Sequence, residues 1–379
     1  MIACGISSTV RQDPSPGRPD PVTTGKLVPC PSEEQLASSE RADECFAFSV
    51  EIDGRPFRFV ADHGATLSML TNSAAKALGL ADQFAQATRV DTLVAHGGVK
   101  PARDSSADYV AERGDTTIEY WGDFEPLRLD SIRLGRSVQR DLLIPFEVQP
   151  GTIGPFDGLL GREVLSQFDL EVEVPRGVLR LYPRSAPRSD GDPLWLPNGL
   201  SARDCVPAVV IRHDAFPDTM KLDSEFVHGI DTIPAVRRLW NEEQLKLPIV
   251  ANGRRIDAEL DTGMNQTIMN WAAARLLGLD RNSPTLRPDG VGGLTALAFK
   301  AQIQPGADTM NYQVAGIILR LGRRTLPADT VIISDLSFVD FPRFLTEPLM
   351  LVGLRHLRND LLFVSYSSRK VCIAARAPT

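Results

Sequence analysis

The stretches "RFVADHGATLSML" (residues 58–70) and "AELDTGMNQTIMN" (residues 258–270) share one arrangement of residue types. In each, apolar residues lead to an aspartate, Asp62 or Asp261, and one further residue separates that aspartate from a glycine. The intervening residue is a histidine in the first stretch and a threonine in the second. The aspartates stand 261 − 62 = 199 positions apart, and two such similar stretches indicate an internal repeat with that spacing.

A shift of 199 positions aligns residues 48–80 with residues 247–279 without a gap. The aligned segments share the glycines Gly54 and Gly253 and end on the same tripeptide, Leu-Gly-Leu. Similarity continues with small gaps in two further pairs of segments: 131–138 with 318–325, and 158–183 with 349–374. The sequence therefore predicts two repeated domains, both mostly β.

Each copy carries the signals of a β-hairpin followed by a short helix. Apolar residues alternate along 48–52 and 247–251, which favours half-buried strands. An Asp-Gly pair and an Asn-Gly pair follow, and both tolerate the positive φ of a tight turn. Further on, "TNSAAKALGL" (71–80) and "NWAAARLLGL" (270–279) combine helix-forming residues with a closing glycine. Both segments predict short helices.

Composition sets the expected domain boundaries. Residues 1–43 are rich in Pro, Ser, Thr and charge and nearly lack aromatic residues, so they predict a disordered tether. Residues 44–184 and 204–379 are the two predicted lobes. Residues 185–203 have the Pro, Gly, Ser and Asp bias that is typical of a linker.

Charge and hydropathy exclude several classes of partner. The chain has 41 basic and 48 acidic residues, a net charge of -7, and no basic block interleaved with aromatic residues. Nucleic acid is therefore not an expected partner. The longest apolar runs, such as "VPAVVI", are too short to cross a bilayer, so the sequence predicts no transmembrane span.

The cysteines and histidines do not form a recognisable metal motif. The five cysteines are widely spaced, form no C-x-x-C pair and are odd in number, so they indicate neither a zinc site nor a disulfide framework. The five histidines show no H-x-x-x-H spacing. We therefore expect no metal and no other cofactor.

Two aspartates at equivalent positions of a repeat suggest acid-base catalysis, whereas a single aspartate would not. A single aspartate at a strand end is usually a turn-former or a helix cap. If a pseudo-twofold axis brings Asp62 and Asp261 together, both charges cannot persist at short range, and the pair holds one proton. Such a pair contains a base that can activate water and an acid that can protonate a carbonyl oxygen. The glycine after each aspartate permits a close approach of the backbone.

The full set of matching motifs is Asp261-Thr262-Gly263, its variant Asp62-His63-Gly64, and the apolar segments Leu159-Leu160-Gly161 and Leu351-Val352-Gly353. Through these residues the chain resembles the aspartic peptidases, specifically the retropepsin-like domains of bacterial aspartyl proteases. The resemblance covers residues 44–184 and 243–376. It implies an all-β fold of two pseudo-symmetric closed β-barrel lobes with few short helices.

The resemblance also implies a site and a reaction. Asp62 and Asp261 are the expected catalytic pair, and His63, Gly64, Thr262 and Gly263 are the expected supporting loop residues. The implied activity is that of an endopeptidase on a protein or peptide substrate, performed by a monomer whose two lobes form an intramolecular pseudo-dimer. Homodimerisation of the second lobe is the alternative if the two aspartates lie far apart.

His63 departs from the family pattern, which has Thr or Ser in this position, with hydroxyls that join the active-site loops of the two lobes. A histidine is larger and ordinarily titrates near neutral pH. The alternative interpretation is therefore a degenerate, peptide-binding relative that has lost turnover. Residues 95–100 and 290–294 are candidate starts of flap strands. The predicted tether favours a periplasmic or secreted protein, although the sequence does not exclude the cytoplasm. The small residues around Cys4 make it a candidate for lipid attachment, but the charged and apolar segments of a signal peptide are missing, and an ordinary cysteine near a disordered start is the alternative.

Overall fold

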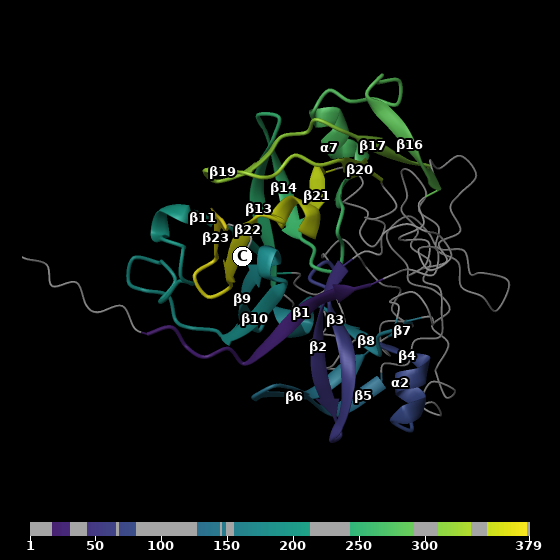
Figure 1. Cartoon of the computed structure of the whole chain (residues 1–379), viewed down its shortest axis with the longest axis vertical. Coiled ribbons are helices and arrows are strands. Elements are labelled where there is room, and N and C mark those ends of the chain that lie inside the picture. Colours follow the sequence, from purple (N-terminus) through teal and green to yellow (C-terminus); the bar gives the residue numbers. More distant parts are fainter. Residues whose placement is uncertain are drawn as a thin grey trace, which may run out of the picture.

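The chain folds mainly into β-strands with few short helices (Figure 1). A computed structural model of the chain describes residues 17–30, 44–65, 68–80, 127–144, 146–148, 155–212, 243–291, 310–334 and 347–376. The strands in these ranges form one 13-stranded and one 10-stranded sheet. The all-β prediction is confirmed, whereas closure of each lobe into a barrel stays a prediction. No helix in the described ranges is long and apolar enough to span a membrane.

The two halves of the chain use equivalent strand pairings. Each has a hairpin whose second strand pairs in parallel with a later short strand, and that strand pairs antiparallel with a third. In the first half these strands are β2 (Glu44–Ile52), β3 (Arg55–Ala61), β8 (Gly158–Leu160) and β4 (Met69–Thr71). In the second half they are β13 (Glu243–Ala251), β14 (Arg254–Leu260), β21 (Leu349–Val352) and β15 (Thr267–Met269).

The predicted turns and helices are confirmed. Asp53 and Asn252 have φ of 50° and 44°, and a glycine with positive φ follows each of them, as a tight hairpin turn requires. Helix α2 (Asn72–Ala77) begins after Thr71, whose hydroxyl accepts a hydrogen bond from the Ala74 N–H. Helix α7 (Trp271–Leu276) begins after Asn270, whose side chain caps it in the same way.

Further strands complete each half. The first half adds β5 (Leu127–Leu134), β6 (Ser137–Ile144) and β7 (Phe146–Val148). The second half adds β12 (Val209–Arg212), β16 (Leu286–Val291), β17 (Met310–Val314), β18 (Leu319–Leu321), β19 (Arg324–Thr325) and β20 (Val331–Ile333). Of the two candidate flap segments, residues 95–100 and 292–294 lie outside the described residues, and Gly290 and Val291 end β16.

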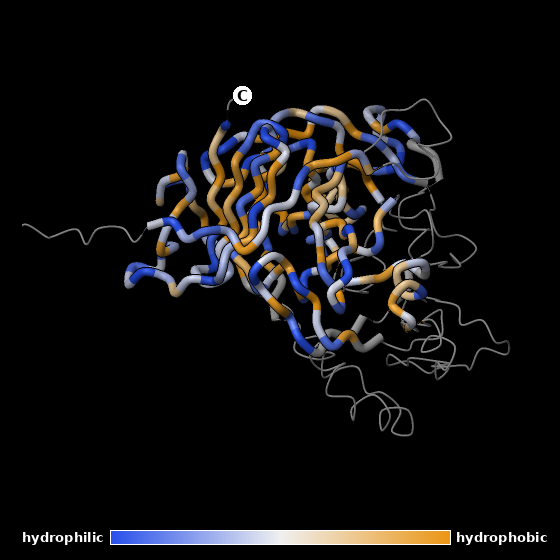
Figure 2. Tube along the Cα trace, turned by 60° about the horizontal axis from the view of Figure 1, so that its bottom comes forward, coloured by the Kyte–Doolittle hydropathy of each residue, from blue (hydrophilic) through white to orange (hydrophobic). Residues whose placement is uncertain are grey.

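The closing hairpins of both halves join one sheet. The first hairpin is β9 (Phe168–Glu173) and β10 (Val178–Pro183), and the second is β22 (Asp360–Ser365) and β23 (Lys370–Ala375). Strand β22 pairs antiparallel with β9, so the yellow and teal hairpins lie side by side in Figure 1. Hydrophobic residues recur along the paired strands (Figure 2), and one buried core cluster contains side chains from both halves. The shared sheet therefore fixes the two halves against each other.

Short helical turns lie beside these strands. Helix α4 (Arg162–Leu165) follows β8, and the 3-10 helix η5 (Leu354–Leu357) follows β21. The 3-10 helix η1 (Val174–Arg176) connects β9 to β10, and the 3-10 helix η2 (Ala202–Asp204) precedes β11 (Cys205–Pro207). The predicted linker, residues 185–203, packs on the shared sheet. The centroid of the Trp195 ring lies 4.5 Å from the ring centroid of Tyr182 and 4.8 Å from that of Phe363.

The predicted disordered tether over residues 1–43 is wrong for residues 17–30. Strand β1 (Thr23–Pro29) pairs with both β10 and β2, so it lies inside the larger sheet. Arg18 forms an ion pair with the buried Glu171 and lies over the Tyr182 ring. The composition failed as a guide because backbone hydrogen bonds on both edges hold this strand, and these form with almost any sequence. Residues 1–16 and 31–43 lie outside the described residues.

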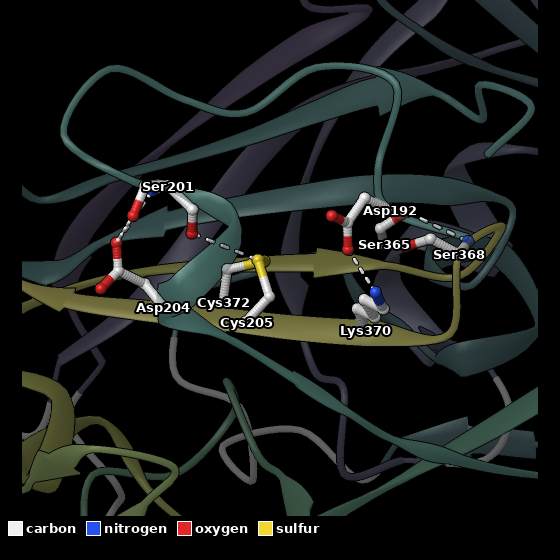
Figure 3. Close-up of a disulfide and its surroundings, with 8 residues drawn as sticks. All are labelled: Asp192, Ser201, Asp204, Cys205, Ser365, Ser368, Lys370 and Cys372. Carbon is white, nitrogen blue, oxygen red and sulfur yellow. Dashed lines mark hydrogen bonds and ion pairs between the residues drawn. A yellow bond between two sulfur atoms is a disulfide. The ribbon is translucent and has the colours of Figure 1, made fainter. Parts of the chain in front are cut away.

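Four of the cysteines form two disulfides, Cys30–Cys45 and Cys205–Cys372, a pairing that the sequence had left open. Cys205 lies opposite Cys372 in the pairing of β11 with β23, beside the Lys370–Asp192 ion pair (Figure 3). The partners are 15 and 167 residues apart. Sequence spacing did not show these pairs because the strand pairing of separate segments brings them together.

We expect these four cysteines to resist alkylation when the chain is denatured without reductant, and a peptide map should contain two disulfide-linked pairs. Reduction should lower the free energy of unfolding by about 2–5 kcal/mol for each native disulfide removed. Mass spectrometry and urea unfolding measure the two effects. Cys4→Ser, outside the described residues, is the control and should leave the map unchanged. Alkylation of all four cysteines without reductant would contradict the pairing.

Candidate active site

Each aspartate of the repeat follows directly on a buried strand. Asp62 follows β3, and its N–H donates a hydrogen bond of 3.0 Å to the Leu160 carbonyl. Asp261 follows β14, and its N–H donates a hydrogen bond of 3.0 Å to the Val352 carbonyl. The predicted apolar segments therefore lie directly beside the two loops. They hold both aspartates at equivalent places in the two halves.

The two loops contact each other through their glycines. A Cβ atom added to Gly64 would lie 2.3 Å from Asp261 Oδ2, and one added to Gly263 would lie 2.5 Å from Asp62 Cγ. Both distances are far below any real carbon contact, so a side chain at either position would displace the aspartate of the other half. The structure thus brings together four of the six predicted site residues, each glycine against the aspartate of the other half.

Thr262 joins the loops by hydrogen bonds. Its hydroxyl accepts a 3.0 Å hydrogen bond from the His63 N–H and donates a 2.7 Å hydrogen bond to the Ala61 carbonyl. The side chain is fully buried, so no water competes for these bonds. Thr262 therefore fixes the first loop from the second, as the family pattern implied.

The two carboxyl groups do not share one environment. Burial raises the pKa of Asp62, while the backbone N–H groups of Ala65 and Gly64 lower it. Burial and then the charge of Asp62 raise the pKa of Asp261 well above its ordinary value. Asp261 is also only 4% exposed, whereas Asp62 is half-buried. Both carboxyl groups therefore hold a proton more readily than an ordinary aspartate does.

His63 does not titrate near neutral pH in this fold. Its side chain is buried, and its Nε2 is hydrogen-bonded to the hydroxyl of Tyr366. Burial and then the positive charge of Arg162 lower the pKa of His63 to about 3. This corrects the expectation from sequence, because a neutral imidazole beside the pair contributes no charge across most of the pH range.

A buried ion pair next to the loops was not predicted from the sequence. Arg162 Nη1 lies 2.8 Å from Glu259 Oε2, and the two side chains are 4% and 6% exposed. Arg162 comes from the first half and Glu259 from the second, and the charge of Arg162 lowers the pKa of both catalytic candidates. The repeat contained a signal for this pair, because each charged residue stands where the other half has an apolar one. Leu354 is equivalent to Arg162, and Val60 is equivalent to Glu259.

One family of known proteins matches part of the first half of the chain. The sequence model of a family described as aspartyl protease matches residues 48–117, which include Asp62 and its loop. Over these residues the chain is similar to aspartyl proteases. This similarity supports a protease function. A second such domain in residues 204–379 stays a prediction, since the family match lies in the first half.

One solved structure similar to this chain is a retropepsin-like aspartic protease from Rickettsia conorii. The sequence identity is 16%, the TM-score is 0.21, and the match covers 42% of this chain and 92% of the other. No curated protein matches the chain. Among the described residues, no three His, Cys, Asp or Glu side chains gather as ligands for a metal ion.

We expect Glu259→Gln to destabilise the fold by about 3 kcal/mol, because it removes the carboxylate that lies 2.8 Å from the buried charge of Arg162. Urea unfolding measures this loss. The matched control is Glu51→Gln, which removes the Glu51–Arg133 pair, whose side chains are 47% and 50% exposed. The control should change the unfolding free energy by less than about 1 kcal/mol. Equal effects of the two substitutions would contradict a structural role for the buried pair.

Proposed function

We propose that the chain is an aspartic endopeptidase in which Asp62 and Asp261 form one catalytic pair across the two halves. The observation that carries the proposal is the reciprocal contact of the loops, with each glycine against the opposite aspartate. The raised pKa of Asp261 supports a shared proton. The match to the aspartyl protease family around Asp62 supports the reaction class.

The proposed reaction uses water as the nucleophile. Asp62 takes a proton from the water as its oxygen bonds to the carbonyl carbon, and Asp261 gives its proton to the carbonyl oxygen. The tetrahedral intermediate then collapses: the carbon–nitrogen bond breaks, the leaving nitrogen takes the proton from Asp62, and the hydroxyl proton returns to Asp261. Atoms and charges balance without a metal or a covalent enzyme intermediate. The greater exposure of Asp62 fits its role as the base.

A catalytically inactive peptide-binding module is the second candidate function. His63 is the observation that favours it, because an imidazole replaces the hydroxyl that the family uses to join its loops. Against it stands Thr262, which still makes its hydrogen bonds to the first loop. Both candidate functions include binding of a peptide, and only the endopeptidase cleaves it.

The two disulfides support a location outside the reducing cytoplasm, in the periplasm or beyond it. They do not bear on lipid attachment at Cys4, which lies outside the described residues. The non-reducing peptide map proposed above tests the location when it is applied to protein taken from its own cells. Free thiols at all four positions in that material would argue for the cytoplasm.

We expect Asp62→Asn and Asp261→Asn each to lower kcat for a mixed peptide library by about 10²–10⁴-fold, because either amide removes the acid-base pair. The matched control is Asp53→Asn: this residue lies in an exposed turn whose counterpart in the repeat is Asn252, so the substitution fits the backbone. The control should cleave like the unchanged chain.

Full activity in either Asn variant would contradict the catalytic pair. Peptide binding without cleavage by any form of the chain, measured from pH 3 to pH 8, would favour the binding module. Activity should fall as pH rises through the pKa of Asp261, because Asp261 then loses the proton that it donates. His63 should add no transition of its own above its pKa of about 3.

A further inference from the structure

The reciprocal partner of Thr262 in the first loop is His63, and its side chain makes a different contact. Thr262 bonds across to the backbone of the first loop. The His63 imidazole instead bonds through Nε2 to the Tyr366 hydroxyl, and its Nδ1 has no hydrogen-bond partner among the described residues. Within that part of the chain, Tyr366 is thus the one hydrogen-bonding partner of this side chain. The loop of Asp62 is held by two residues of the second half.

Tyr366 is itself held firmly. It is the first residue after β22, and its side chain is 2% exposed. Its N–H donates a 3.0 Å hydrogen bond to Asp169 Oδ1, and the Arg184 guanidinium lies 5.0 Å from its ring centroid. Asp169 and Arg184 both belong to the first half. The Tyr366 hydroxyl that is hydrogen-bonded to His63 therefore belongs to a buried side chain that residues of the first half hold in place.

The repeat shows that this contact belongs to one half only. Val174 is the first residue after β9, as Tyr366 is the first residue after β22. The first half, whose hairpin has valine at this turn, therefore offers no hydroxyl equivalent to that of Tyr366. The half with histidine in its motif lies opposite a hairpin with tyrosine. The two departures from symmetry occur together and contact each other.

We propose that Tyr366 is a positioning residue for Asp62 that acts through His63. This inference rests on the proposed peptidase function, because it concerns the geometry of the same pair. His63 is joined to Asp62 by one peptide bond, so fixing its N–H and its imidazole from opposite sides fixes the orientation of the Asp62 carboxylate. Thr262 supplies the first anchor and Tyr366 the second. Tyr366 touches neither substrate nor water in this role.

The test measures kcat and KM for Tyr366→Phe, His63→Phe and the double variant. Tyr366→Phe should lower kcat about tenfold, the effect of losing one hydrogen bond, with KM unchanged. In the His63→Phe background the same substitution should add nothing, because the contact is already lost. The control is Tyr182→Phe, which also removes a buried hydroxyl, one bonded to Glu171 at 2.7 Å. The control should keep its kcat.

A second readout does not depend on activity. In the full chain, the ¹³C chemical shift of the Asp62 carboxyl, followed against pH, should give a different pKa in Tyr366→Phe and an unchanged one in Tyr182→Phe. Additive effects of Tyr366→Phe and His63→Phe on kcat would overturn the inference. An unchanged Asp62 titration in Tyr366→Phe would overturn it too. A chain that cleaves no peptide but shows the titration change supports the positioning role while the proposed function fails.

Discussion

The rest of this structure depends on two carboxyl groups that the fold brings close together, those of Asp62 and Asp261. Each would be solvated and ionised in the unfolded chain; burial raises the pKa of both, and the charge of Asp62 raises that of Asp261 further. The folded chain therefore binds a proton more tightly than the unfolded chain does. Its free energy of unfolding falls as pH rises from the ordinary aspartate pKa through the raised pKa of Asp261. The fold must offset this cost with contacts made elsewhere.

Several features offset the cost, and most of them join the two halves. Backbone N–H groups donate to both carboxylates, at 2.9 Å from Ala65 and 2.9 Å from Gly263. Arg162 supplies a positive charge that Glu259 holds in place from the other half. The pairing of β22 with β9 connects the halves through continuous backbone hydrogen bonds. The halves are equivalent in topology but not in side-chain chemistry. Apolar residues stand at the repeat positions equivalent to Arg162, Glu259 and Tyr366, and Thr262 stands at the position equivalent to His63.

Local rules made much of this structure predictable. The turns at Asp53 and Asn252, the two short helices and the aspartate loops follow from residue types that favour one backbone conformation. Strand β1, the disulfides and the Arg162–Glu259 pair were missed because segments far apart in the chain create them. The contact of Tyr366 with His63 could not be read from the sequence, since only the turn of a remote hairpin brings the two residues together. For Arg162 and Glu259 the repeat does hold a trace, since each is a charged residue at a position where the other half has an apolar one.

The central claim is that Asp62 and Asp261 hold one proton between them. The direct measurement is a ¹³C titration of both aspartate carboxyl carbons in the full chain, alone and with Asp62→Asn. We expect Asp261 to keep its proton well above the ordinary aspartate pKa. Its pKa should fall in Asp62→Asn, where the neighbouring charge is gone. Two independent titrations near the ordinary value, unchanged by the substitution, would contradict a pair formed across the two halves.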